Sequence, residues 1–152
     1  MFIYHDLEGK KVSLSFQPGN FPIPSRHVLV IASYQGETLF TEHRERGIEL
    51  PGGKCEDGES LHVAAAREVL EETGAYIEDL EWLAEYLVEA DEPFCKTVFT
   101  ANVKEFHPTF SPMETTGAIV LPLREILHRS NASFHMKDES MKKIIGRVID
   151  GE

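Results

Sequence analysis

Residues 53–75, GKCEDGESLHVAAAREVLEETGA, contain five glutamates, and four of them (Glu59, Glu68, Glu71 and Glu72) stand with Arg67 at fixed spacings between Gly53 and Gly74. Glu68, Glu71 and Glu72 stand at i, i+3 and i+4. At roughly 100° per residue, this spacing brings the three carboxylates to one face of a helix. Like charges so close together repel one another, and hard oxygen ligands of this kind suit Mg²⁺ or Mn²⁺. The stretch therefore indicates a helix whose acidic face suits a divalent cation.

The same helix carries signals at both ends and on its other side. Ser60 is a suitable N-cap, and Gly74 is a suitable C′ residue that ends the helix near Thr73. Packing against a sheet is expected from the residues opposite the carboxylates, which are Val63, Ala66, Val69, Leu70 and Thr73. Taken alone, an acidic helix face is more often merely solvated, so a metal site needs support from the rest of the stretch.

That support comes from the complete pattern G-x5-E-x7-R-E-U-x-E-E-x-G-U, where U is a small or aliphatic residue. Its fixed positions are occupied by Gly53, Glu59, Arg67, Glu68, Val69, Glu71, Glu72, Gly74 and Ala75. At average residue usage, a chance match in a chain of this length is on the order of one in a million. By this pattern the chain resembles the Nudix hydrolases. The resemblance implies an α/β fold, an α/β/α sandwich with a central mixed β-sheet and the motif loop and helix at the active site.

The resemblance also implies an activity and its ligands. Nudix enzymes hydrolyse a nucleoside diphosphate linked to another moiety, with a water molecule whose attack on phosphorus is assisted by metal ions. The implied cofactor is Mg²⁺, with Mn²⁺ as an alternative. By resemblance the metal ligands are Glu68, Glu71 and Glu72, with the carbonyl oxygen of Gly52 as a further ligand.

Roles for other residues follow less directly from the motif. Glu68 is the first candidate for the general base, and Glu114, in the loop SPMETTG before a predicted strand, is the second. Glu105 is a weaker alternative. The resemblance implies that Arg67 pairs with Glu59 and locks the loop onto the helix, so both are expected to support catalysis through geometry.

Substrate contacts are expected just before the helix. Lys54 resembles a lysine that contacts phosphate in nucleotide-sanitising members of the family, and Arg46 is a further phosphate candidate, although surface exposure explains that region nearly as well. The segments TEHRERGIELPGGK and SFHMKDE resemble the YtkD-type members. Those members act on purine nucleoside triphosphates, including 8-oxo-dGTP, and release pyrophosphate and the monophosphate. We therefore expect a nucleoside triphosphate pyrophosphohydrolase.

Two other functions remain open from the sequence. The same metal site could remove pyrophosphate from the 5′ end of triphosphorylated RNA, but the net charge of −11 supplies no basic groove for an RNA body. A non-catalytic nucleotide-binding regulator could use the same scaffold. Intact glutamates at positions 68, 71 and 72 argue against that reading.

Length and composition limit the number of domains, the cellular location and the kinds of partner that we expect. A chain of 152 residues with 41% hydrophobic residues has the size and composition of one globular domain, spanning residues 1–152. The sequence shows no membrane-length apolar stretch and no secretory signal pattern. Two cysteines are too few for a disulfide framework. We expect a cytoplasmic enzyme with a small nucleotide as its partner, without binding to membranes or double-stranded nucleic acid. The oligomeric state stays open.

Hydrophobic patterning outside the motif predicts a mixed sheet between helical layers. Strands are expected at 11–16, 27–34, 38–43, 80–89, 96–103 and 116–121. Helices are expected at 61–73, 123–129 and 139–149. Segment 80–89 is ambiguous, because Leu80, Leu83 and Leu87 also suit a helix.

Overall fold

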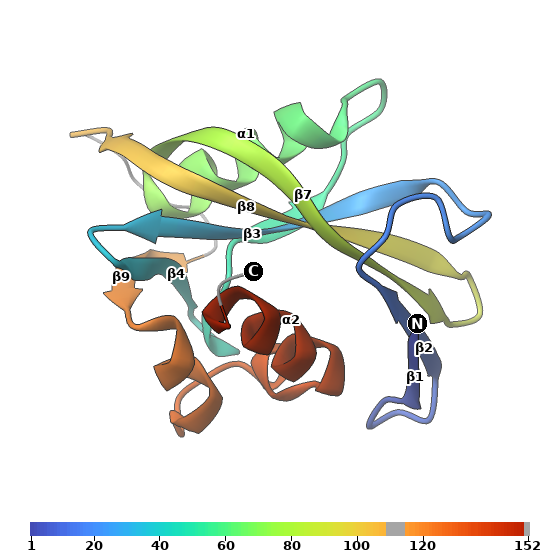
Figure 1. Cartoon of the computed structure of the whole chain (residues 1–152). Coiled ribbons are helices and arrows are strands. Elements are labelled where there is room, and N and C mark those ends of the chain that lie inside the picture. The colour runs from blue at the N-terminus through green and yellow to red at the C-terminus, as the bar shows by residue number, and fades with distance from the viewer. Residues whose placement is uncertain (109–114, 151–152) are drawn as a thin grey trace.

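A twisted sheet runs through the protein, and helices cover both of its faces (Figure 1). The structure, a computed structural model, describes residues 1–108 and 115–150. The strands of these residues are β1 (Phe2–His5), β2 (Lys11–Ser15), β3 (Ser25–Tyr34), β4 (Glu37–His43), β5 (Gly47–Glu49), β6 (Gly52–Lys54), β7 (Ala75–Glu89), β8 (Phe94–Phe106) and β9 (Thr115–Leu121). The helices are α1 (Leu61–Thr73) and α2 (Glu139–Ile149), with short 3-10 helices η1 (Leu123–His128) and η2 (Phe134–Lys137).

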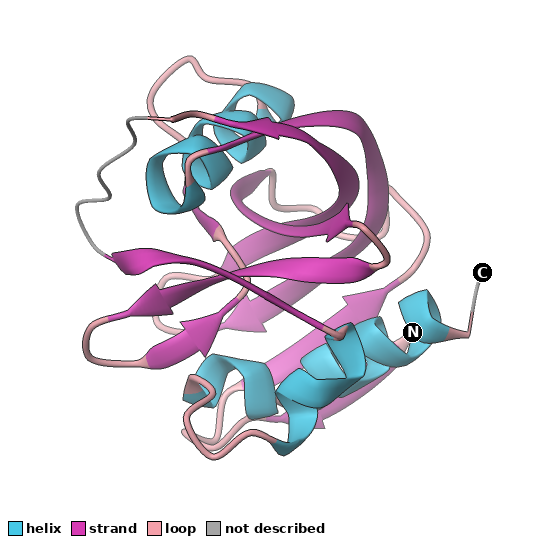
Figure 2. Cartoon of the chain, turned by 90° about the vertical axis from the view of Figure 1, so that its left-hand side faces the viewer, coloured by secondary structure: helices cyan, strands magenta, loops and turns pink. Residues whose placement is uncertain are grey.

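The sheet is mixed, as the sequence predicts. Its main path is β1-β2-β7-β8-β3-β4-β5, with β6 paired to β3 and β9 paired to β4. Within the described residues, β3 and β8 form the one parallel pair of named strands, and the other pairs are antiparallel. Helix α1 lies on one face, and η1, η2 and α2 lie on the other (Figure 2). The predicted α/β/α arrangement is confirmed.

Strand β3 separates the two hydrophobic cores. Val28 and Val30 pack in the cluster that contains α1, whereas Leu29 and Ile31 pack in the cluster that contains α2. Side chains alternate between the faces of a strand, so a strand covered on both sides must be apolar throughout. This explains the continuous hydrophobic run at the start of HVLVIASY.

The ambiguous segment 80–89 belongs to a long strand, β7, which pairs with β2 and β8. The register of β7 against β8 shifts between Trp82 and Ala84. A bulge at this place puts an extra residue into the strand and changes the face to which the following side chains point. Trp82 therefore packs in the α1 cluster and Ala84 in the α2 cluster. Leu80 and Leu83 pack in different clusters, so the three-residue spacing that also suits a helix does not mark one face of this segment.

Helix α1 has the predicted ends, but a different face is buried. Ser60 accepts a hydrogen bond from the Val63 N–H, and Gly74 adopts the left-handed conformation with φ 77°. The buried residues are Ala64, Ala65, Val69 and Thr73, whereas Val63 is 56% exposed. The prediction that Val63 and Ala66 face the sheet was wrong. The helix is turned so that its acidic face adjoins the buried face instead of lying opposite to it.

The C-terminal part also differs in detail. The helix predicted at 123–129 is a 3-10 helix over Leu123–His128, which follows Pro122. Helix α2 matches the predicted range 139–149, and Asp138 caps its N-terminus. Among the described residues, neither helix combines the length and hydrophobicity needed to cross a membrane.

Candidate active site

The segment 52–60, called the glycine loop below, brings the backbone of two glycines next to the acidic helix α1. Gly52 and Gly53 lie in β6, antiparallel to β3. A Cβ atom at Gly52 would collide with the carbonyl of Val28, and one at Gly53 would overlap the carboxylate of Glu68. The N–H of Gly52 donates to Glu72 Oε1 at 3.0 Å. Close approach to backbone therefore requires glycine at position 52, whereas a Cβ at position 53 would displace the Glu68 carboxylate.

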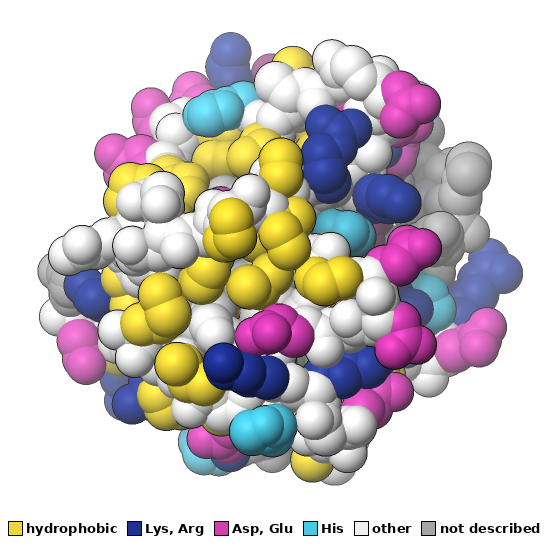
Figure 3. All heavy atoms as spheres, turned by 90° about the vertical axis from the view of Figure 1, so that its right-hand side faces the viewer, with side chains coloured by type: hydrophobic (Ala, Val, Ile, Leu, Met, Phe, Trp, Pro, Cys, Tyr) yellow, Lys and Arg dark blue, Asp and Glu magenta, His cyan; other side chains and the backbone are white. Residues whose placement is uncertain are grey.

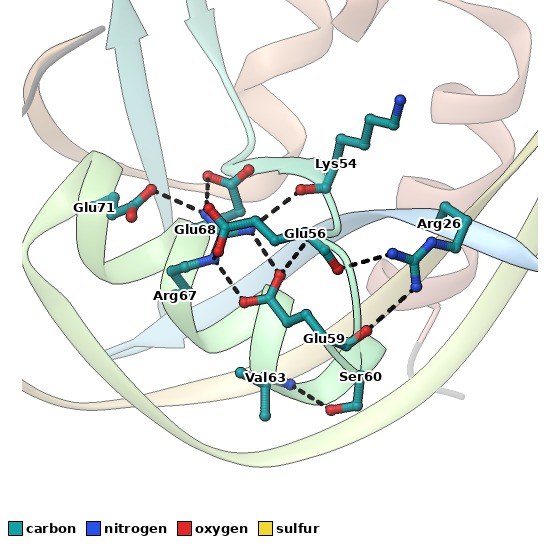
Figure 4. A network of polar contacts seen from close by, with 9 residues as sticks. All are labelled: Arg26, Lys54, Glu56, Glu59, Ser60, Val63, Arg67, Glu68 and Glu71. Atoms are coloured by element: carbon teal, nitrogen blue, oxygen red, sulfur yellow. Dashed lines mark hydrogen bonds and ion pairs between the residues drawn. The ribbon is translucent and has the colours of Figure 1, made fainter.

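Arg67 joins this loop to the helix (Figure 4). Its Nε donates to Glu59 Oε2 at 2.7 Å, and its Nη2 donates to Glu59 Oε1 at 2.9 Å. Nη2 also donates to the Lys54 carbonyl at 3.2 Å. A forked, charge-assisted pair of this type fixes both partners in orientation. The ion pair that the family resemblance implies between Glu59 and Arg67 is confirmed.

The outer side of the loop is held by Arg26, which the sequence did not single out. Its Nη2 donates to the Glu56 carbonyl at 2.8 Å, and its Nη1 donates to the Glu59 carbonyl at 3.4 Å. The Glu56 N–H in turn donates to Glu59 Oε1 at 2.9 Å. Hydrogen bonds from Arg67, and then from this N–H, lower the pKa of Glu59 to about 2. The loop is thus fixed by charged side chains on both sides.

The three motif carboxylates do not share one environment. The Glu68 side chain is 15% exposed and that of Glu71 is 58% exposed. Arg67 Nη1 lies 3.5 Å from Glu68 Oε1 and donates to Glu71 Oε1 at 3.1 Å. Arg67 therefore offsets part of the repulsion between the glutamates, while Glu72 is turned towards Gly52.

The chemistry of these residues fits a hard divalent cation. Glu68 occupies space that a Cβ at Gly53 would need, and Glu72 accepts a hydrogen bond from the Gly52 N–H. Carboxylate oxygens are preferred ligands of Mg²⁺ and Mn²⁺. In the part of the chain that the structure describes, no three acidic, histidine or cysteine side chains are grouped closely enough to hold a metal ion as they stand. A cation held by all three motif glutamates would require Glu71 to leave Arg67, to which it is now bound.

The other residues that the sequence proposed for substrate binding or as general base lie near the motif glutamates or away from them. Lys54 is exposed, and its side chain extends away from the Arg67 cluster (Figure 4). Arg46 binds Glu49, with Nη2 donating to Oε1 at 2.8 Å and Nε at 3.2 Å from the same oxygen. Glu105 is exposed near the end of β8, opposite Tyr76. Glu114 lies outside the described residues.

A cavity of about 220 Å³ opens on the α2 face of the sheet. Most of its walls are apolar or aromatic, and they include Tyr4, Leu29, Tyr86, Phe94, Lys96 and Phe134. Leu29 also stands in register with Gly52 across the β3–β6 pair. Neighbouring strands lie about 4.8 Å apart, so the cavity begins one strand away from the glycine loop. This cavity could not be predicted from the sequence, because its walls come from segments far apart in the chain.

The fold, the glycine loop and the glutamate helix define a class of enzyme. Residues 23–141 match the model of the NUDIX domain. The chain belongs to the Nudix hydrolases, enzymes that cleave phosphoanhydride bonds and generally use divalent metal ions.

Individual relatives place the chain within that family. It is 38% identical over 151 residues to the "Putative 8-oxo-dGTP diphosphatase YtkD" of Bacillus subtilis, covering 95% of this chain and 96% of the relative. It is also similar to the crystal structure of the Bacillus subtilis pyrophosphohydrolase BsRppH, with a TM-score of 0.88, 32% identity and coverage of 99% and 97% of the two chains. A NUDIX hydrolase from Nitrosomonas europaea shares the fold, with a TM-score of 0.69, 24% identity and coverage of 84% and 90%. The resemblance to YtkD-type Nudix hydrolases is confirmed.

Proposed function

We propose that the chain is a metal-dependent nucleoside triphosphate pyrophosphohydrolase that releases a nucleoside monophosphate and pyrophosphate. The observation that carries the proposal is the packing of Glu68 and Glu72 against Gly53 and Gly52. This arrangement joins carboxylate oxygens to a backbone segment that a phosphate chain can approach without meeting a Cβ. The similarity to YtkD, named as a putative diphosphatase, and to BsRppH, named as a pyrophosphohydrolase, supports hydrolysis of a phosphoanhydride bond.

Each motif residue has a distinct task in this proposal. Glu68, Glu71, Glu72 and the Gly52 carbonyl hold Mg²⁺ or Mn²⁺, which neutralises phosphate charge and acidifies water. Glu68 takes the proton of the attacking water, with Glu114 as the alternative base. Lys54, which follows Gly53 directly, binds a substrate phosphate as a point charge. Glu59 and Arg67 keep the loop and helix in register and do not contact the substrate.

Oxidised guanine nucleotides are the first substrates to examine. The relative with 38% identity is named for 8-oxo-dGTP, and the aligned region spans nearly the whole chain. We therefore propose 8-oxo-dGTP as a substrate beside the ordinary purine triphosphates. This is a matter of base recognition, which the motif residues do not determine, because they contact phosphate and metal.

The similarity to BsRppH favours one second candidate, removal of pyrophosphate from triphosphorylated RNA 5′ ends. The same phosphoanhydride is broken, so the metal centre would serve both reactions unchanged. The two candidates differ in what lies beyond the first nucleoside. An RNA body adds phosphates, and the net charge of −11 opposes their approach.

The products formed with Mg²⁺ test the proposal. We expect dGTP, 8-oxo-dGTP, ATP and a triphosphorylated oligonucleotide to yield pyrophosphate and the corresponding monophosphate end, with free triphosphates preferred. Hydrolysis in ¹⁸O-water identifies the attacked phosphorus from the product that carries the label. Release of orthophosphate and a nucleoside diphosphate would contradict the proposal, and a strong preference for the oligonucleotide would favour the second candidate.

A further inference from the structure

The aromatic cavity has the size and position of a site for a nucleobase. Its volume of about 220 Å³ is below the roughly 300–1,000 Å³ of pockets that hold drug-sized ligands. Tyr86 and Phe94 on the sheet, and Phe134 on η2, supply ring faces, and bases stack favourably on aromatic side chains. The face that contains β1, β2 and the β7–β8 turn, at the right of Figure 1, gathers hydrophobic side chains beside basic and acidic ones (Figure 3).

A row of basic residues connects this cavity to the glycine loop. His27 on β3 stands in register with Lys96 on β8 and with Lys54 on β6. At about 4.8 Å between strands, the Cα atoms of Lys54 and Lys96 lie about 10 Å apart. The ring of His27 also packs on Phe94, with ring centroids 4.8 Å apart. A nucleotide whose phosphates lie at the glycine loop can therefore reach the cavity with its base.

Two lysines line the cavity, and whereas Lys10 forms an ion pair with Glu8, Lys96 contacts an aromatic ring. Its Nζ lies 6.0 Å from the centroid of the Tyr86 ring. Within residues 1–108 and 115–150, no hydrogen bond or ion pair engages this Nζ. Burial lowers the pKa of Lys96, while the carboxylates of Glu49 and Asp138 act in the opposite direction and Arg46 adds to the lowering. A partly desolvated ammonium is stabilised when a ligand supplies an acceptor.

The carboxylates and the arginine nearest to Lys96 are engaged with other groups. Within the described residues, the buried Nδ1 of His27 has no hydrogen-bond partner, but His27 is not part of the cavity wall. The carboxylate of Asp138 caps α2 and accepts hydrogen bonds from the Tyr4 hydroxyl and from the Ser140 N–H at 3.3 Å. Arg46 and Glu49 bind each other. Burial lowers the pKa of His135, and its ring packs on Phe134 with centroids 4.0 Å apart. Lys96 is therefore the side chain best placed to offer hydrogen-bond donors to a bound base.

An ammonium group offers donors only, so it distinguishes bases by their acceptors. Guanine presents two acceptors, O6 and N7, on one edge, whereas adenine presents N7 next to an amino group that is itself a donor. We propose that Lys96 selects 6-oxopurine nucleotides by donating a hydrogen bond to O6 of a base held in this cavity, with N7 as a second acceptor in guanine and hypoxanthine. In 8-oxoguanine N7 carries a proton, so O6 alone accepts from Lys96. This inference rests on the proposed nucleotide hydrolysis and adds the residue that sets base preference.

The kinetics of Lys96→Met test it with four substrates: GTP, ITP, ATP and purine riboside triphosphate, which has no substituent at C6. Methionine keeps the apolar length of the side chain and removes the donors. We expect kcat/KM for GTP and ITP to fall roughly 10- to 100-fold, mainly through KM, with less than about a threefold change for the other two. Lys104→Met, an exposed position on the same strand, is the matched control and should leave all four values unchanged.

Two other kinetic outcomes would overturn the inference. An equal loss for all four substrates would assign Lys96 to phosphate or ribose, and no loss for GTP would remove it from recognition. If the wild-type protein hydrolyses no triphosphate, the proposed function fails on its own. Calorimetric titration with GMP, IMP and AMP then tests the cavity separately, with tighter binding of GMP and IMP expected and its loss expected in Lys96→Met. Equal binding of the three monophosphates would contradict the inference.

Discussion

The carboxylate of Glu68 packs so closely on Gly53 that a Cβ at position 53 would overlap it. At this point the loop and the helix are so close that even a methyl group at position 53 would displace the Glu68 carboxylate. This close approach also explains why the pattern begins with a glycine fifteen residues before the glutamate, since the two residues meet only when the loop folds back on α1 (Leu61–Thr73).

Replacing this glycine should disturb the chemistry more than the fold. In Gly53→Ala the Glu68 carboxylate must move, and misplacement by about 1 Å can lower a rate roughly 100-fold. We expect a loss of kcat of that size or larger, with circular dichroism unchanged. Gly146→Ala is the control, since a Cβ in that helical position meets no atom within 4 Å. Normal turnover in Gly53→Ala would argue against a catalytic role for the contact.

The motif glutamates should be needed for turnover and not for folding. Glu68→Gln and Glu72→Gln keep side-chain size but remove the charge, so kcat should fall roughly 10²- to 10⁴-fold while the melting temperature stays within a few degrees. Pyrophosphate release and thermal unfolding measure the two effects. Glu78→Gln, exposed on β7, should behave as wild type. Near-normal rates in either motif variant would contradict the metal-site assignment.

The ion pair between Glu59 and Arg67 should make stability depend on pH in the acid range. Because the pKa of Glu59 is lowered from 4.5 to about 2, its contribution is present above about pH 4.5 and is lost as the pH falls towards 2. Urea unfolding at pH 7, 5, 4 and 3 should therefore show Glu59→Gln less stable than wild type at pH 7 and the difference shrinking on acidification. Glu56→Gln, with a side chain 70% exposed, should show little difference. A gap that stays constant with pH would exclude this linkage.

Arg46 is expected to matter for stability through Glu49. The Glu49 side chain is 9% exposed and accepts two hydrogen bonds at Oε1, so Arg46→Met leaves a mostly buried carboxylate without this partner. We expect a loss of about 1 kcal/mol or more in the free energy of unfolding. Arg44→Met, an exposed neighbour, serves as the control. If the variant is fully stable but shows a raised KM, Arg46 acts on phosphate, as the sequence suggested.

Local signals made most of the fold predictable. Ser60 and Gly74 set the ends of α1 correctly, because capping depends on a few adjacent residues. The side of α1 that faces the sheet was predicted in part: Val69 and Thr73 are buried as expected, but Val63 and Ala66 are exposed. Periodicity fixes the angles between residues, but it does not fix how the helix is turned against the sheet. β1 was not predicted, because its four residues become a strand only through pairing with β2.

In the candidate site, too, the sequence predicted the residues with local contacts and missed those whose neighbours are distant in the chain. The motif located Glu59 and Arg67, whose pairing depends on one loop and one helix. Arg26 and Lys96 carry no local pattern, because the residues around them come from distant segments. Arg26 on β3 binds the loop that follows β6, and Lys96 lies beside β3 in the sheet. Burial and register are properties of the folded chain, and they are what separates a surface lysine from one that faces a cavity.

Crystals soaked in Mn²⁺ with a non-hydrolysable nucleoside triphosphate analogue test the central claim most directly. Anomalous scattering locates manganese independently of any assumption about ligands. We predict a peak between the Gly52 carbonyl and the carboxylates of Glu68 and Glu72, with Glu71 turned away from Arg67 and the phosphates of the analogue beside the metal. Absence of any manganese peak next to α1, with the analogue bound elsewhere, would contradict the account.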